Sequence, residues 1–154
     1  MNQIFNWKIK TFSQLNTDEL YDFLKLRIDV FVVEQTCYYS DLDDLDRDPN
    51  TRHVFAYDGD VIVAYCRVLA PNVVYDNESA IGRVIVSDAY RGHGLANKLM
   101  ALAIEQTQQL WPEQTCHISA QQYLEGFYQS LGFETLGDMY LEDGIPHIAM
   151  RRSA

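Results

Sequence analysis

The chain has 154 residues, of which 47% are hydrophobic, so it is long enough for one sizeable core and short for two. We therefore expect a single domain over residues 1–154. Twelve basic and 22 acidic residues give a net charge of −10, which argues against binding of nucleic acid or of an anionic membrane surface. Any anionic ligand must then be held by a local site.

The cysteines Cys37, Cys66 and Cys116 follow no paired spacing. Such an odd, sparse set fits a reducing compartment better than a disulfide framework, and without a C-x-x-C pair it does not indicate a metal site.

The N-terminus carries no long apolar run after a basic region, and no window approaches the roughly 18 apolar residues of a membrane-spanning helix. These features predict a soluble, cytoplasmic protein.

In the N-terminal half, residues 5–12 (FNWKIKTF) alternate between apolar and polar and predict a first strand. Asn16 followed by Glu19 resembles a capping box, and apolar residues then recur at helical spacing until about residue 35. No periodicity survives from Thr36 to Arg52, and a loop of that length inside a compact domain is more often functional than idle.

The acidic loop (residues 40–50, SDLDDLDRDPN) has five aspartates between Asp41 and Asp48. Their alternation resembles a calcium-binding loop, but Pro49 stands where the sharp turn needs glycine, and Phe55 where the bidentate glutamate should be. We therefore expect no calcium. The aspartates either favour a cationic acceptor or form a solvated loop.

Residues 53–69 contain two β-rich runs separated by Asp58-Gly59-Asp60, which predicts a hairpin. Further along the chain we expect alternating strands and helices, and therefore a mixed α/β sheet. The expected elements are a strand at 80–86, a helix at 94–110 that stops before Pro112, a strand at 115–120, a helix at 123–133 closed by Gly132, and an antiparallel pair over 137–150.

The stretch IGRVIVSDAYRGHGLANKLM (residues 81–100) runs from a strand through two glycines into a helix. A helix N-terminus presents unpaired N–H groups and the positive end of the helix dipole, which together suit an anion. Gly92 and Gly94 would let the backbone approach a pyrophosphate, and Arg91 could add a charge-assisted contact. The same letters are also compatible with a plain strand-to-helix turn.

Two other phosphate motifs do not match this stretch. A P-loop requires Gly-Lys followed by Ser or Thr, which is absent. A dinucleotide fingerprint requires a third glycine, where this chain has Asn97, and an acidic residue about 20 positions on. The pattern that remains is Arg-x-x-Gly-x-Ala at residues 91–96.

On these residues the chain resembles the GNAT family of acyl-CoA-dependent N-acetyltransferases. RGHGLA (91–96) matches the family signature, and GFYQSLGF (126–133) resembles its helix that ends in Tyr, three residues, Gly-Phe. LRIDVFVVEQ (26–35), IGRVIVSDAYRG (81–92) and EDGIPHI (142–148) are similar to the ElaA-like branch. The resemblance covers nearly the whole chain.

The resemblance implies a mixed, mostly antiparallel sheet with two splayed parallel strands at its centre, flanked by helices. It also implies that acetyl-CoA binds in the gap between residues 80–86 and 115–120. The pantetheine would be bound by backbone groups and the pyrophosphate by N–H groups of the glycine stretch. The residues concerned are Val84, Ile85, Val86, Arg91, Gly92, His93, Gly94, Leu95 and Ala96.

The resemblance assigns Tyr128 as the general acid that protonates the leaving thiolate. A core tyrosine on an amphipathic helix would give the same local pattern. Seven residues earlier the family often carries Asn, whereas this chain has Gln121, which puts the cofactor contact at that position in doubt.

The general base is open. Many family members place a glutamate on the central strand, but this chain has Gly82 and Arg83 there. A positioned water or an acceptor amine that is already neutral would make a dedicated base unnecessary. The residues that could line the acceptor site or accept a proton are Glu34, the acidic loop, His53, Glu142 and His147.

Two alternative functions are compatible with the sequence. An acyl-CoA-binding sensor would keep the glycine stretch but would need no Tyr128. Arg27, Phe31, Asp43, Asp46, Arg67 and Arg83 also resemble the acyl-homoserine lactone synthases, although the chain is short for them. We favour direct acetyl transfer to a primary amine of a small molecule or peptide, with a homodimer formed through an exposed strand near the C-terminus as a further hypothesis.

Overall fold

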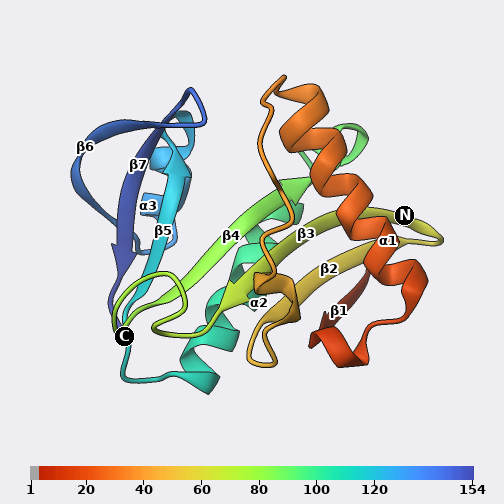
Figure 1. Cartoon of the computed structure of the whole chain (residues 1–154), viewed down its shortest axis with the longest axis horizontal. Coiled ribbons are helices and arrows are strands. Elements are labelled where there is room, and N and C mark those ends of the chain that lie inside the picture. The colour runs from red at the N-terminus through yellow and green to blue at the C-terminus, as the bar shows by residue number, and fades with distance from the viewer. Residues whose placement is uncertain (1–3) are drawn as a thin grey trace.

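A seven-stranded sheet with the order β1-β2-β3-β4-β5-β7-β6 forms the centre of the computed structural model, which describes residues 4–154 (Figure 1). The strands are β1 (Asn6–Lys10), β2 (Arg52–Asp58), β3 (Val61–Leu69), β4 (Ser79–Val86), β5 (Cys116–Gln121), β6 (Glu134–Glu142) and β7 (Ile145–Arg152). The helices are α1 (Thr17–Arg27), α2 (Leu95–Leu110) and α3 (Glu125–Ser130). The shorter helical segments are η1 (Phe12–Gln14), η2 (Ile28–Glu34), η3 (Leu45–Arg47), η4 (Asp88–Tyr90) and η5 (Gln122–Leu124).

The central strands β4 and β5 are parallel, whereas every other neighbouring pair in the sheet is antiparallel. Their pairing is confined to Ser79 opposite Cys116 and Ala80 opposite His117, although β4 continues to Val86. The two strands therefore diverge, and Figure 1 shows the gap that opens between them. This arrangement confirms the predicted fold class, a mostly antiparallel mixed sheet with two splayed parallel strands at its centre.

Helix α1 begins with the expected capping box. The Asn16 side chain accepts a hydrogen bond from the Glu19 N–H at 2.7 Å, and the Asn16 N–H donates to the Glu19 carboxylate at 3.0 Å. Beyond Arg27 the helix continues as the π-helical segment η2, which the sequence pattern predicted only as helix. Such wider turns occur frequently at functional sites.

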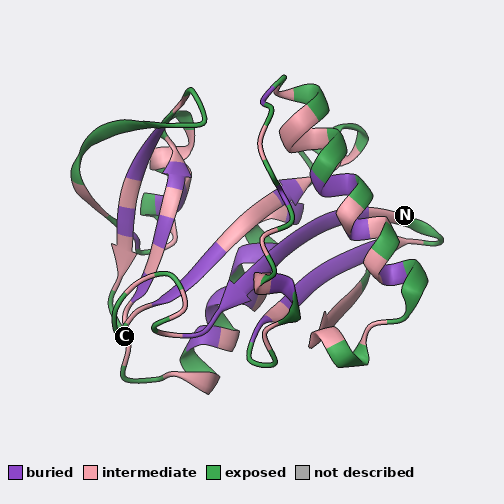
Figure 2. Ribbon diagram, in the orientation of Figure 1, coloured by how far each residue is buried: buried purple, intermediate pink, exposed green. Residues whose placement is uncertain are grey.

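Two hydrophobic clusters cover the opposite faces of the sheet (Figures 1 and 2). Helix α2 buries Leu95, Leu99 and Ala103, spaced four residues apart, against one face. Helix α1 buries Phe23 and Leu26 against the other face. Because both faces of the central strands are covered, β2 and β3 are buried over almost their whole length.

The remaining expected elements are confirmed with small shifts at their ends. The hairpin at 53–69, the strand at 80–86, the helix at 94–110 and the strand at 115–120 correspond to β2 with β3, β4, α2 and β5. The predicted helix at 123–133 is divided into η5 and α3, and Gly132 follows it with φ +95°. The antiparallel pair near the C-terminus is β6 with β7.

Candidate functional site

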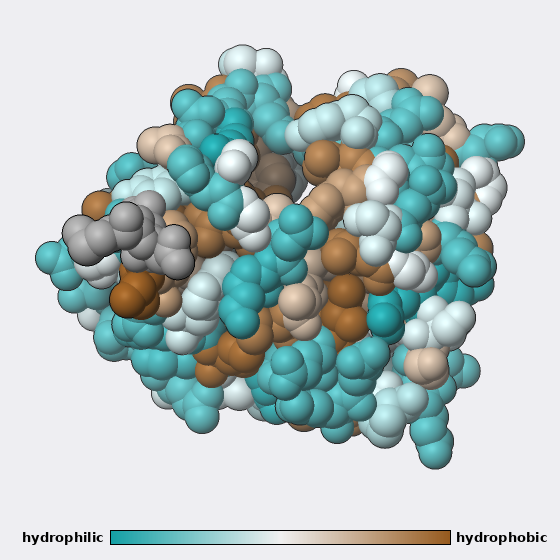
Figure 3. Space-filling model, turned by 180° about the vertical axis from the view of Figure 1, so that it is seen from behind, coloured by the Kyte–Doolittle hydropathy of each residue, from teal (hydrophilic) through white to brown (hydrophobic). Residues whose placement is uncertain are grey.

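A cavity of about 710 Å³ occupies the gap between β4 and β5. Its walls come from both of these strands, from η2, from the loop before β2, from α3 and from the β6–β7 turn. Seen from behind, the molecule has a notch at its upper edge, with hydrophobic side chains along its walls (Figure 3). The volume suits a substantial organic ligand.

A β-bulge shapes the β4 wall of this cavity. The register shifts between Tyr65 opposite Ile85 and Arg67 opposite Gly82, and Arg83 adopts φ +53°. A non-glycine residue in the left-handed region is strained, and such strain is concentrated at functional sites. Beyond the bulge, Val84, Ile85 and Val86 line the cavity on the stretch of β4 that β5 does not pair. Backbone groups left unpaired there need other partners, and a ligand that carries amides can supply them.

The glycine stretch connects β4 to the N-terminus of α2. Gly92 has φ +83° and Gly94, the N-cap residue of α2, has φ +77°. A Cβ atom at either position would meet no atom within 4 Å, so the conformation and not the space requires glycine. No side chain caps this helix, and its first-turn N–H groups lack an intrahelical acceptor. Arg91 and Ala96 also line the cavity, so the N-terminus of α2, a type of site that suits an anion, lies at its rim.

Arg91 joins two of the residues singled out from the sequence. Its guanidinium contacts Glu34 Oε2 at 2.8 Å and Asp88 Oδ1 at 3.2 Å, and its Nε donates to the Val86 carbonyl oxygen at 3.0 Å. The hydrogen bond from Arg91 to Glu34 raises the pKa of the guanidinium further. Because both partners are about 40% exposed, the pair contributes little stability, and a phosphate could replace Glu34 at low cost.

Tyr128 lies on α3, lines the cavity and is 5% exposed. Phe127 and Phe133 pack edge-on against its ring, with centroids 5.2 Å and 6.0 Å away. Burial raises the pKa of the Tyr128 phenol well above its usual value, so the group is protonated at neutral pH. No hydrogen bond engages its hydroxyl within residues 4–154, which leaves the proton available to a ligand.

A polar cluster lies on the part of the cavity wall where β5, β6 and β7 are neighbours. His147 Nδ1 is 2.7 Å from the Ile145 carbonyl oxygen, and His147 Nε2 is 3.4 Å from Glu142 Oε2. Ser119 hydrogen-bonds the Tyr140 hydroxyl and also Glu142 Oε1, the latter at 3.4 Å. The structure therefore brings Glu142 and His147 together on the cavity wall.

Gln121, the residue that replaces the family's common asparagine, also lines the cavity. Its amide donates to the Gln35 side-chain oxygen at 3.3 Å, which connects the end of β5 to the end of η2.

The acidic loop is only partly solvated, since Asp44 is exposed, Asp43 lines the cavity, and two other aspartates are buried. Asp41 and Asp46 are buried and bind Arg27 at 2.8 Å and 2.7 Å. Asp43 pairs with Arg67, and Arg83 binds Asp41 at 2.8 Å. Burial opposes ionisation of Asp46, but the hydrogen bond from Arg27 outweighs it and holds the pKa of Asp46 below its usual value. The arginines of α1, β3 and β4 thus neutralise Asp41, Asp43 and Asp46, so a cationic acceptor would have to compete with them for these carboxylates.

His53 is also placed differently from the expectation. It is fully buried beneath α1, stacked on Phe23, with its ring nitrogens bonded to the Tyr65 hydroxyl at 2.6 Å and the Asp46 carbonyl oxygen at 3.0 Å. It does not line the cavity, so the expectation that it contacts substrate is wrong. Burial is the main reason why its pKa is lowered, and the neutral ring serves the core.

Sequence reasoning missed Tyr39 and Tyr75 as cavity residues. Tyr39 hydrogen-bonds Asp41 at 2.9 Å and packs under the Arg83 guanidinium, whereas Tyr75 stacks on His117 with ring centroids 3.7 Å apart. Both come from irregular segments, where no periodic pattern assigns a side chain to a face.

The three thiols are free and buried. Burial raises the pKa of Cys66 above its usual value and that of Cys116 to about 12. Cys37 lines the cavity, where its thiol donates to the Asp143 carbonyl oxygen at 3.2 Å. None of the three has an adjacent base that would make it a nucleophile.

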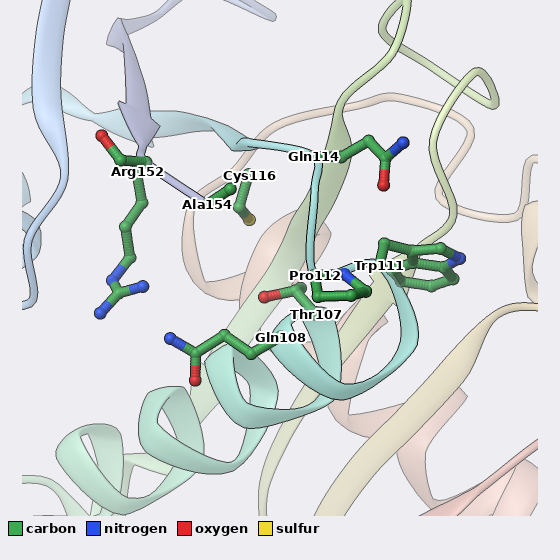
Figure 4. Close-up of a pocket in the computed structure, with 9 residues that line it drawn as sticks. Thr107, Gln108, Trp111, Pro112, Gln114, Cys116, Arg152 and Ala154 are labelled. Atoms are coloured by element: carbon green, nitrogen blue, oxygen red, sulfur yellow. The ribbon is translucent and has the colours of Figure 1, made fainter.

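A second hollow beside the end of α2 holds only about 10 Å³, which is room for a single water (Figure 4). Between residues 4 and 154, no group of three or more His, Cys, Asp or Glu side chains is arranged to hold a metal ion. No helix in the same range is both long and apolar enough to cross a membrane.

Comparison with known proteins gives concordant results. Residues 19–154 match the family model described as acetyltransferase (GNAT) domain. The chain is 41% identical over 149 residues to Protein ElaA of Escherichia coli, covering 97% of each chain, and the ElaA crystal structure superimposes with a TM-score of 0.91. A crystal structure of an acyl-CoA N-acyltransferase from Pseudomonas aeruginosa is 41% identical, with a TM-score of 0.92 over 97% of this chain and 100% of that one. The CoA-dependent acyl-homoserine lactone synthase BjaI shares the fold at 20% identity, with a TM-score of 0.73 over 94% of this chain and 81% of that one.

Proposed function

Because the chain belongs to the GNAT acetyltransferase family, in its ElaA-like branch, we propose that it transfers an acetyl group from acetyl-CoA to a primary amine of a small molecule or peptide. The transfer is direct, within a ternary complex, and one domain spanning residues 1–154 carries it out. The observation that supports this most strongly is that one cavity is lined by three features. These are the unpaired end of β4, the two end residues of the glycine stretch (Arg91 and Ala96), and Tyr128.

In this proposal the cofactor binds along β4. Backbone groups of Val84, Ile85 and Val86 bind the pantetheine amides, and Gln121 faces the same ligand from β5. The pyrophosphate is bound by N–H groups at the start of α2 and by the Arg91 guanidinium. The cradle residues are Arg91, Gly92, His93, Gly94, Leu95 and Ala96. The side chain of Leu95 is buried in the core, so this residue contributes through its backbone.

The chemistry assigned to the site balances simply. The amine nitrogen attacks the thioester carbonyl carbon, the new C–N bond forms and the C–S bond breaks. Tyr128 donates its phenolic proton to the leaving thiolate, and the proton lost by the amine is released to solvent, from which the phenol regains its proton before the next turnover. A buried phenol without a competing hydrogen-bond partner suits this step, since its proton is held at neutral pH and is directed to no protein acceptor.

The two alternatives have less support. A sensor that only binds acyl-CoA needs no buried proton donor in the cavity, yet Tyr128 is placed there. The likeness to the homoserine lactone synthase is one of fold. The Arg27, Arg67 and Arg83 side chains that prompted that comparison are engaged by aspartates of the chain itself.

Calorimetric titration with acetyl-CoA tests the cofactor assignment. We expect wild-type protein to bind in the micromolar range, and a Gly94→Glu variant to lose at least tenfold in affinity because a carboxylate then occupies the anion site. Gly59→Glu is the matched control, since Gly59 also has positive φ (+60°) and open space but lies in the β2–β3 turn. Equal affinity of wild type and Gly94→Glu would contradict the assignment, as would no binding by wild type.

The proposal extends to the setting of the protein. Free, buried thiols fit a reducing compartment, and we place the enzyme in the cytoplasm.

Strand β6 is an edge of the sheet and exposes Met139 and Leu141, so we propose a homodimer formed across this edge. A solution mass by light scattering that equals one chain would contradict the dimer.

A further inference from the structure

Five polar side chains of β5, β6 and β7 share one face of the sheet, and four of them, all except Tyr140, line the cavity. In the strand register, His147 lies opposite Gln121 of β5 and opposite Tyr140 of β6. Residues two apart on a strand share a face, which adds Ser119 and Glu142 to the same side. Because the hairpin turn at Asp143 and Gly144 follows directly, the Glu142–His147 pair lies at the open end of this face.

The hydrogen bond at Nδ1 decides which nitrogen of His147 can act. The Ile145 carbonyl oxygen, 2.7 Å from Nδ1, can only accept, so Nδ1 carries the hydrogen. In the neutral ring, Nε2 therefore carries the lone pair. This atom lies 3.4 Å from Glu142 Oε2. Nε2 and Oε2 are then two neighbouring acceptors, and an ammonium group in the cavity can donate to both. His147 itself is only 7% exposed, whereas the Glu142 side chain is 50% exposed.

The charges on the cavity wall favour a cation at this place. Arg67 and Arg83 are neutralised by Asp41, Asp43 and Asp46, and Arg91 is neutralised by Glu34. Glu142 and Asp143 also line the cavity, and neither has an arginine or lysine partner within residues 4–154. This end of the cavity is thus negatively charged, and the net charge of −10 draws cations toward it.

We propose that the Glu142–His147 pair receives the ammonium group of the acceptor and that His147 Nε2 removes its proton before attack. This inference rests on the proposed acetyl transfer and specifies the acceptor as an amine that is cationic at neutral pH. One N–H bond of the ammonium breaks and the proton moves to Nε2. The imidazolium is then stabilised by Glu142, and the free amine carries the lone pair that forms the C–N bond. After transfer, the proton leaves Nε2 for solvent.

Polar and charged groups surround His147. Glu142 and Tyr140 face it from β6 and Gln121 from β5, and Asp143 of the turn lines the same cavity. A general base accepts a proton only while it is itself unprotonated. Activity toward an ammonium acceptor should therefore fall on the acidic side of a pH profile.

The test compares two small acceptors of similar shape at saturating acetyl-CoA, with release of free CoA thiol as the readout. Ethylamine is an ammonium ion at neutral pH, whereas 2,2,2-trifluoroethylamine is mostly a free amine. We expect His147→Gln to lower kcat/KM for ethylamine about 100-fold or more, because general base catalysis is typically worth that much. For trifluoroethylamine we expect a loss below about threefold, and the acidic limb of the ethylamine profile should disappear.

Glu142→Gln gives a second, milder test that does not depend on a buried residue. We expect KM for ethylamine to rise about threefold, as for an exposed ion pair, and KM for trifluoroethylamine to stay unchanged. Glu134→Gln is the matched control, since Glu134 lies on the same strand, is exposed and is outside the cavity. Melting temperature and acetyl-CoA titration of each variant verify that the fold and the cofactor site are intact.

The outcomes separate this inference from the proposed function. Equal losses for the two amines, an unchanged acidic limb, or wild-type activity only toward the neutral amine would overturn the role of the Glu142–His147 pair while amine acetylation stands. Binding of acetyl-CoA by wild type without transfer to any amine would overturn the proposed function, and the inference with it.

Discussion

At the scale of single residues, Tyr128 is informative because its side chain is buried in the protein and also lines the cavity. The phenol is almost fully enclosed by α3 side chains and by the edges of two aromatic rings, yet it borders the cavity. Burial keeps the phenol protonated, and within residues 4–154 no protein group accepts its proton. A tyrosine that only filled the core would not need to border a ligand cavity.

We predict that Tyr128→Phe lowers kcat about 10²- to 10⁴-fold and leaves acetyl-CoA affinity within about twofold of wild type. The substitution removes the donor and keeps the ring that packs against Phe127 and Phe133. Steady-state kinetics and calorimetry on the same preparation measure both quantities. Tyr38→Phe, at a side chain that is 91% exposed, is the control. Unchanged turnover in Tyr128→Phe would remove the tyrosine from the mechanism.

At the scale of elements, a buried ion network ties the irregular segment before β2 to the rest of the fold. Arg27 is fully buried at the end of α1 and binds both Asp41 and Asp46. Arg67 of β3 and Arg83 of β4 hold the same segment from the sheet. Burial lowers the pKa of Arg27, but the surrounding carboxylates outweigh it and keep the guanidinium charged. The network therefore fixes a cavity wall that has no regular secondary structure of its own.

We predict that Arg27→Leu destabilises the fold by about 3–5 kcal/mol, because it leaves two buried carboxylates short of their partner. For a chain of this size that corresponds to a fall in melting temperature of roughly 10 °C. Thermal unfolding followed by circular dichroism measures the change. Arg47→Ala is the control, because it removes an ion pair whose Arg47 and Asp44 side chains are 72% and 87% exposed. It should change the free energy of unfolding by no more than about 0.5 kcal/mol. A similar small effect of Arg27→Leu would show that the network contributes no stability.

At the scale of the whole molecule, two glutamates link separate elements of the fold. Glu19 of α1 binds Lys8 and Lys10 of β1, each at 2.9 Å. Glu78, just before β4, binds Arg151 of β7 at 2.6 Å and also bonds Thr115. Burial raises the pKa of Glu19, but the lysine hydrogen bonds outweigh it and the pKa falls from 4.5 to about 2. The Arg151 hydrogen bond is the main reason why the pKa of Glu78 also falls to about 2.

The direction of the resulting pH dependence follows from these shifts. Both folded-state pKa values are below the unfolded value of 4.5, so each glutamate contributes its full stability above about pH 4.5 and loses it as the pH falls toward 2. We predict a contribution of about 2 kcal/mol from Glu19, which is less than the full shift because both lysines are partly exposed.

Melting temperatures between pH 7 and pH 2 test this. Glu19→Gln should be less stable than wild type at pH 7 and nearly equal to it at pH 2, whereas the exposed Glu134→Gln should follow wild type throughout. A constant difference between Glu19→Gln and wild type across this range would contradict the linkage.

Local patterns in the sequence predicted much of this molecule. The Asn16–Glu19 capping box, the four-residue spacing of apolar side chains in α2 and the positive-φ glycines before it depend on residues within a few positions of one another. Alternation and helical periodicity report which face of an element is apolar, and that is a local property. The elements, their order and, through the resemblance of two short motifs, the family could therefore be read before any coordinates.

Only the tertiary structure decided which polar groups meet. Cys37 contacts the Asp143 carbonyl, Arg91 contacts Glu34, and Gln121 contacts Gln35, each across more than 50 positions of the chain. No periodicity encodes such pairs, because they depend on strand register and on where β4 and β5 part. For the same reason His53 proved to be a core residue, the acidic loop proved to be neutralised by arginines, and Glu142 and His147 came to face each other. The sequence by itself determined the elements and the glycine motif, whereas the long-range packing of the sheet determined the polar cavity wall formed by β5, β6 and β7.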